Sequence, residues 1–161
     1  RNTGACLSPQ NAFYNSIGME TLGLRMERVC DNAKTLAQFF ATEYSDIEVN
    51  YPGLAGSKWH NIATEQFGDK FGGIITIRTG NKKRAFGIID ALKLPLIVSN
   101  IGDTKTLVIH PESTLNVHST QEEKETAGVF DDLIRISVGI EDIEDLIDDF
   151  KQAIESVKDV Y

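Results

Sequence analysis

The sequence predicts an α+β sandwich in which a small, mainly antiparallel sheet is covered on one face by helices. Short β-branched runs alternate along the 161 residues with longer stretches of helical periodicity. Glycine- and proline-containing turns, such as Tyr51-Pro52-Gly53 and Thr79-Gly80-Asn81, separate these segments. Hydrophobic residues make up 41% of the chain and charged residues 25%, a balance typical of a globular domain.

The first 45 residues are predicted to be a long helical stretch. Ser8 provides an N-cap and Pro9 suits the first helical position. Gly18 and Gly23 would each cost about 1 kcal/mol relative to Ala in a helix interior, so a kink is expected there. Apolar residues at three-and-four spacing predict one buried face: Leu22, Met26, Val29, Cys30, Ala33, Leu36, Ala37 and Phe40.

Residues 46–161 are predicted to form the sandwich itself. We expect strands where short β-branched or apolar runs end in turn signals, at 47–50, 74–78, 94–98, 107–109 and 133–138. We expect helices at 58–66, 82–92 and 143–157, and a helical turn at 122–126. In the second of these helices Phe86, Ile89 and Leu92 are aligned, whereas residues 112–121 are polar and expected to be irregular.

Charge and hydropathy exclude several classes of partner. The net charge of −8 repels nucleic-acid phosphate and anionic lipid, and no apolar run approaches the roughly 20 residues that span a bilayer. The cluster Lys82-Lys83-Arg84 is interpreted as a solvated loop or helix start, and the acids at 141–149 as a solvated helix face. The polar start Arg1-Asn2-Thr3-Gly4 resembles no signal peptide, and the lack of an initial Met indicates a fragment or a processed product.

No metal site is predicted. Cys6 and Cys30 lack a Cys-x-x-Cys spacing, and Cys30 fits a small core position. This cysteine usage favours a reducing cytoplasm as the compartment. His60, His110 and His118 are widely spaced, and His110-Pro111 is expected to close a strand.

Arg135 is the first candidate for a binding role. Strand alternation places Ile134, Ile136 and Val138 on one face of the last strand, and Leu133, Arg135 and Ser137 on the other. Such a lone cation in an apolar strand is a solvated edge residue, the partner of a structural acid, or a ligand for a carboxylate. The second candidate, Asn100-Ile101-Gly102-Asp103, has turn character, and by itself it is typical of an ordinary loop.

Several segments, taken in order, resemble the Cys/Met-metabolism enzymes that use pyridoxal phosphate (PLP). They are Gly4-Ala5-Cys6-Leu7-Ser8-Pro9, Thr21-Leu22-Gly23-Leu24-Arg25-Met26, Tyr51-Pro52-Gly53-Leu54, Phe71-Gly72-Gly73, Asn100-Ile101-Gly102-Asp103, His110-Pro111 and 133–141. The resemblance implies the smaller C-terminal domain of the type I, aminotransferase-like PLP-transferase fold. Residues 1–45 would link it to a large PLP-binding domain upstream.

The resemblance also implies a site. Arg135 would bind the α-carboxylate of a small amino-acid substrate, with Asn100 and Ile101 against that substrate. Asn100-Ile101-Gly102-Asp103 is more similar to the O-acetylhomoserine sulfhydrylase branch. The run Ser113-Thr114-Leu115-Asn116, with His118 two positions late, departs from the family pattern.

No lysine here has the sequence context of the PLP-binding lysine. We therefore expect no catalytic, cofactor-binding or metal-binding residue in this chain, and PLP only in a full-length parent, a homo-oligomer that is tetrameric in the family. The expected parent is an O-acetylhomoserine sulfhydrylase, with cystathionine γ-synthase, cystathionine γ-lyase or methionine γ-lyase as alternatives. A non-catalytic module that binds an amino acid or a partner is the remaining alternative.

Overall fold

A five-stranded mixed sheet lies at the centre of the computed structural model, which describes residue 4 and residues 6–158. Its order is β1-β2-β5-β4-β3, and only β3 and β4 pair in parallel. The strands are β1 (Glu48–Asn50), β2 (Ile74–Arg78), β3 (Leu96–Ile97), β4 (Leu107–Ile109) and β5 (Leu133–Ser137). The predicted α+β class and mainly antiparallel sheet are confirmed, and the sequence features at residues 1–3 and Ala5 lie outside the described residues.

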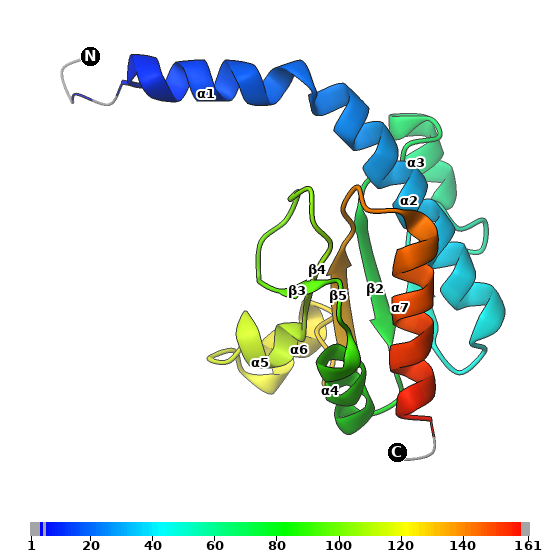
Figure 1. The fold of residues 1–161 in the computed structure, drawn as a ribbon. Coiled ribbons are helices and arrows are strands. Elements are labelled where there is room, and N and C mark those ends of the chain that lie inside the picture. The colour runs from blue at the N-terminus through cyan, green and yellow to red at the C-terminus, as the bar shows by residue number, and fades with distance from the viewer. Residues whose placement is uncertain (1–3, 5, 159–161) are drawn as a thin grey trace.

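Three helices pack on one face of this sheet (Figure 1). They are α2 (Leu22–Glu43), α4 (Lys82–Ala91) and α7 (Ile143–Ser156). The remaining helices are α1 (Pro9–Glu20), α3 (His60–Phe67), α5 (Pro111–Thr114) and α6 (Gln121–Thr126). Residues 112–121 were expected to be irregular, but they include most of the short helix α5. This helix forms because Pro111 suits a first helical turn and the His110 side chain caps it.

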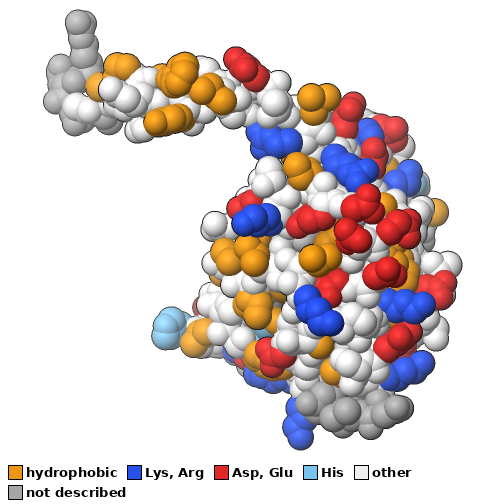
Figure 2. All heavy atoms as spheres, viewed as in Figure 1, with side chains coloured by type: hydrophobic (Ala, Val, Ile, Leu, Met, Phe, Trp, Pro, Cys, Tyr) orange, Lys and Arg blue, Asp and Glu red, His pale blue; other side chains and the backbone are white. Residues whose placement is uncertain are grey.

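The predicted kink is present as a break between α1 and α2 at Thr21. The Arg25 guanidinium spans this break, donating to Thr21 Oγ1 at 3.3 Å and to the Gly18 carbonyl. Helix α1 projects away from the body and has no buried residue, and its visible surface carries hydrophobic side chains (Figures 1 and 2). An uncovered apolar helix is a surface that normally has a partner.

The buried face of α2 starts later than its periodicity predicts. Val29 is the first buried residue of the helix, whereas Leu22 and Met26 are 45% and 41% exposed. Their predicted burial is wrong because the first two turns of α2 extend beyond the end of the sheet (Figure 1).

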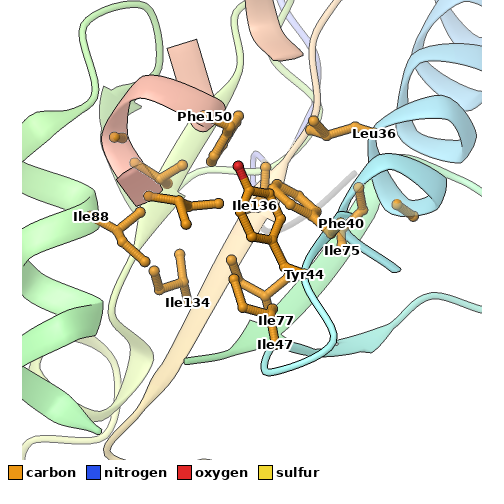
Figure 3. Packing of buried hydrophobic residues seen from close by; sticks show 14 of the residues in the cluster. Leu36, Phe40, Tyr44, Ile47, Ile75, Ile77, Ile88, Ile134, Ile136 and Phe150 are labelled. Atoms are coloured by element: carbon orange, nitrogen blue, oxygen red, sulfur yellow. The ribbon is translucent and has the colours of Figure 1, made fainter. Parts of the chain in front are cut away.

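The core fills the space between the sheet and α2, α4 and α7 (Figure 3). Alternate isoleucines of β2 and β5 point into it, as the strand pattern predicts. The rings of Phe40 and Phe150 meet edge to face at 5.2 Å and are fully buried, so they join α2 to α7. In α4 the core residues are Ala85, Ile88 and Ile89, whereas Phe86 is more exposed than expected and lies against the His110 ring.

Two charged segments predicted to be solvated contain buried residues. Asp149, in the acidic run, is 6% exposed and accepts hydrogen bonds from the backbone N–H groups of Lys93 and Leu94, each at 2.9 Å. Arg84, in the basic cluster, is 8% exposed and pairs with Asp46 at 2.6 Å. A buried charge requires such partners, which lie far away in sequence and which pattern alone does not identify.

Replacing Phe150 by Ala should lower the free energy of unfolding by about 3–5 kcal/mol, because it removes a buried ring and leaves a cavity. Urea denaturation measures this change. Phe13→Ala is the matched control: Phe13 is 63% exposed on α1, and its loss should change stability by less than about 0.5 kcal/mol. Equal effects of the two substitutions would contradict the described core.

Glu112 should make the fold acid-sensitive. Hydrogen bonds from Lys124 at 2.6 Å and Lys82 at 2.7 Å lower the pKa of the Glu112 carboxyl to about 2. A carboxylate with a depressed pKa in the folded state stabilises it fully above its unfolded pKa, roughly 4.3, and loses that contribution as pH falls through the folded pKa. The stability difference between wild type and Glu112→Gln should be constant above about pH 5 and shrink towards pH 2. A difference independent of pH over this range would refute the ion-pair network.

Candidate functional site

Arg135 occupies the middle of β5, on the face of the sheet opposite the three packed helices. Its cross-strand neighbours are Thr76 in β2 and Ile109 in β4. Its Nη2 atom donates to the carbonyl oxygens of Ser99 at 3.0 Å and Asn100 at 3.3 Å. One edge of the guanidinium is therefore held by two neutral backbone dipoles.

The Nε atom of this guanidinium is not satisfied. Arg135 Nε is buried without a hydrogen-bond partner, and no carboxylate of the described residues lies within ion-pair distance of Arg135. Burial alone lowers the pKa of the guanidinium, which stays protonated at neutral pH. Arg135 is thus partly desolvated, and no acid of the described residues is its partner.

Two other arginines of the sheet region show what a structural role looks like. Arg78, also on a strand, binds Asp132 at 2.9 Å and stacks on Phe130. Arg84 pairs with Asp46. Arg135 differs from both of them, because it is partly desolvated and no acid of the described residues pairs with it. A planar guanidinium in that state is a candidate ligand for a carboxylate.

The loop between β3 and β4 supplies the carbonyl groups that hold Arg135. Of the three residues predicted for the site, Arg135 and Asn100 are in contact, although Asn100 contributes its backbone carbonyl rather than its amide. Ile101 is 63% exposed and lies beside them in sequence. Its side chain lines an apolar pocket of about 220 Å³ together with Leu22 and Met26 of α2.

Hydrogen bonds anchor the far side of this loop to the end of β5 and to the turn that follows it. Ser137 Oγ accepts from Gly102 N–H at 3.2 Å, and Ile140 N–H donates to the Thr104 carbonyl at 2.9 Å. The Thr106 hydroxyl accepts from Gly139 N–H and donates to the Glu141 carboxylate, both at 2.9 Å. The solvated-face interpretation of Glu141 is therefore wrong. Ser137 was placed on the Arg135 face by strand alternation, but the sequence did not identify its partner.

The histidines and the other possible metal ligands do not form a second site in the described residues. His110 is buried against Ser113 and the Asp131 carbonyl, so it serves structure by ending β4 and capping α5. In the part of the chain that the structure describes, no three His, Cys, Asp or Glu residues gather as metal ligands. The same described residues contain no helix both long and apolar enough to cross a membrane.

The lysines do not fit a covalent cofactor link. Such a lysine is desolvated, which lowers its pKa, and none of the described lysines is buried. Lys82 and Lys124 bind Glu112, whereas Lys70 binds Asp31, which raises the pKa of its amine. None of the described lysines therefore has, within this chain, the desolvated surroundings of a Schiff-base lysine.

Comparison with known proteins gives a consistent result. The family model described as "Cys/Met metabolism PLP-dependent enzyme" matches residues 1–155. An L-methionine gamma-lyase of Fusobacterium nucleatum subsp. polymorphum is 41% identical over 156 residues, which are 96% of this chain and 39% of that protein. The chain thus spans about two fifths of the length of that relative.

Two solved structures share the fold. One, described as an O-acetylhomoserine (thiol)-lyase from Campylobacter jejuni with a pyridoxyl-lysine monophosphate, matches with a TM-score of 0.89 and 41% identity, over 96% of this chain and 37% of that one. The other, a yeast cystathionine gamma-lyase, matches with a TM-score of 0.92 and 33% identity, over 98% of this chain and 41% of that one.

Replacing Gly139 by Ala should loosen the loop at residues 99–106. A Cβ at this position would lie 2.5 Å from the Thr104 carbonyl oxygen and from a Glu141 carboxylate oxygen, so the loop anchor would have to shift. Native-state hydrogen exchange should show the opening free energy of this loop falling by about 1–3 kcal/mol. Gly56→Ala is the control, because nothing lies within 4 Å of its Cβ. Unchanged protection at 99–106 in Gly139→Ala would count against the anchor.

Proposed function

The chain belongs to the Cys/Met-metabolism family of PLP-dependent enzymes, and from that premise we propose that it is the C-terminal, substrate-binding domain of a larger enzyme. The exposed apolar residues support a larger protein, because an upstream domain would cover them. They lie on α1 and around the β3–β4 loop: Phe13, Tyr14, Ile17, Met19, Leu94, Leu96, Ile97 and Ile101. The upstream domain of the larger enzyme would cover this apolar surface.

One observation carries the functional proposal: neutral carbonyls hold the Arg135 guanidinium in place, its Nε is buried without a partner, and no acid of the described residues neutralises its charge. The α-carboxylate of an amino acid would bind this guanidinium through charge-assisted hydrogen bonds. Because the carbonyls of Ser99 and Asn100 carry no net charge, the guanidinium keeps its full attraction for the ligand. Binding would fix the orientation of the amino acid relative to the rest of the site.

The chain's own residues would bind and orient substrate, and the covalent cofactor link would come from elsewhere in the parent. When bound there, PLP supplies an electron sink for chemistry at the substrate's α-carbon. Arg135 and the loop at 99–104 would hold the substrate so that its Cα–H bond faces the catalytic base. The isolated chain should therefore be inactive.

The reaction we favour is replacement of the acetoxy group of O-acetylhomoserine by sulfide, which gives homocysteine and acetate. Its support is the loop sequence Asn100-Ile101-Gly102-Asp103 and the similarity to the Campylobacter protein. Methionine γ-lyase is the second candidate, because the Fusobacterium methionine gamma-lyase is as similar in sequence to this chain as the Campylobacter protein is. Cystathionine γ-lyase and cystathionine γ-synthase parents are further alternatives.

Product analysis on the full-length parent distinguishes these reactions. Homocysteine formed from O-acetylhomoserine and sulfide supports the first proposal. Methanethiol released from methionine, with little homocysteine synthesis, would replace it by the second. A non-catalytic module would instead show calorimetric binding of O-acetylhomoserine to the isolated chain without PLP.

Removing the Arg135 guanidinium should lower kcat/KM of the parent by roughly 30- to 5,000-fold, the equivalent of the 2–5 kcal/mol typical of a lost buried charge pair. Steady-state kinetics of Arg135→Gln measure this. Arg78→Gln is the matched control: it removes a guanidinium from β2 that is already paired with Asp132, and it should leave kcat/KM within about threefold. An unchanged kcat/KM in Arg135→Gln would overturn the assignment.

A further inference from the structure

The stretch 99–103, which lies over Arg135, has few connections to the sheet. Among the described residues, only two side chains of β5 form hydrogen bonds with it: Arg135, through the carbonyls of Ser99 and Asn100, and Ser137, through Gly102 N–H. Asp103 bonds only locally, to Thr104 and Lys105. If Arg135 is to bind a ligand as well, Ser137 is the remaining contact that fixes the loop independently.

The geometry of Ser137 suits that task. It is two residues after Arg135 in the same strand, so both side chains project from the same face. Ser137 is 2% exposed, and its hydroxyl meets Gly102, whose φ of +78° turns the loop back towards the sheet. The part of the loop that follows Gly102 is fixed separately. The Ile140 N–H donates to the Thr104 carbonyl, and the Glu141 carboxylate accepts from the Thr106 hydroxyl.

We propose that Ser137 is a positioning residue of the carboxylate site: by holding Gly102, its hydroxyl keeps the Ser99 and Asn100 carbonyls on Nη2 of the Arg135 guanidinium and so holds the guanidinium in the orientation that receives the substrate carboxylate. The proposal rests on the proposed function of Arg135. It deepens that function, because it makes carboxylate affinity depend on a hydroxyl that never touches substrate.

The consequence is selective. Without the Ser137 contact, the two carbonyls are free to move away, and the guanidinium is no longer held in one orientation. Affinity for a ligand with an α-carboxylate falls, whereas affinity for the same ligand without the carboxylate does not. A purely structural role would weaken both ligands together.

The test uses the PLP-loaded full-length parent, with L-norleucine, which has no γ-leaving group, and its decarboxylated counterpart pentylamine as competitive inhibitors. Ser137→Ala should raise the Ki of L-norleucine by about 3- to 10-fold, the effect of one lost hydrogen bond, and leave the Ki of the amine within twofold. Ser137→Cys, which keeps the size and a weak acceptor, should give a smaller rise. Thr79→Val is the control, because it removes another buried hydroxyl, one that bonds Asp132 and Asn81 at the far end of β2.

A double-mutant cycle completes the test. In an Arg135→Gln background, Ser137→Ala should change neither Ki further, because the group that it positions is gone. Equal rises for both inhibitors, or an additive cycle, would overturn the role of Ser137 while leaving Arg135 in place. If Arg135→Gln leaves the ratio of the two Ki values as it is in the wild type, the proposed function fails, and the positioning role of Ser137 fails with it.

Discussion

A guanidinium that is partly desolvated and has no acid partner is the constraint on which the site depends. Placing Arg135 in the middle of a sheet makes its unpaired Nε costly, since buried polar groups normally find partners. The fold offsets part of the cost of desolvating the guanidinium with two backbone carbonyls, and in the proposed function a ligand carboxylate would offset the rest. Paired arginines such as Arg84 show that the fold can supply a carboxylate where a structural cation is needed.

The rest of the architecture keeps that arrangement rigid. The isoleucines that flank Arg135 along β5 are fully buried between the sheet and its helices, which fixes the strand. The β3–β4 loop is then anchored to the turn after β5, where Thr106 and Glu141 join it to the start of α7. The Asn32 side chain of α2 donates to the carbonyls of Gly139 and Glu141, so the helix layer also holds this turn. The site is therefore built on strand and helix ends rather than on a free loop.

The sequence predicts much of this fold because its signals are local. Strand alternation placed Arg135 and Ser137 on one face, and two glycines located the break near Thr21. Sequence reasoning failed where a residue's partner is remote. Asp149 and Glu141 look like solvated acids, but the packing of α7 near the end of α4 brings the Lys93 amide to Asp149, and the fold brings the Thr106 amide to Glu141. Leu22 and Met26 follow the helical period but lie past the end of the sheet. The role of Arg135 came from ordered motifs, because spacing alone leaves a structural and a binding arginine indistinguishable.

The most direct test is a crystal structure of the PLP-containing parent with a bound amino-acid ligand that lacks a γ-leaving group, such as L-norleucine. The account predicts that the ligand carboxylate lies about 2.7–2.9 Å from nitrogen atoms of the Arg135 guanidinium, the range of charge-assisted hydrogen bonds. The Ser99 and Asn100 carbonyls should still accept from Nη2. A ligand carboxylate held by another residue, with Arg135 facing an acid of the upstream domain, would contradict it.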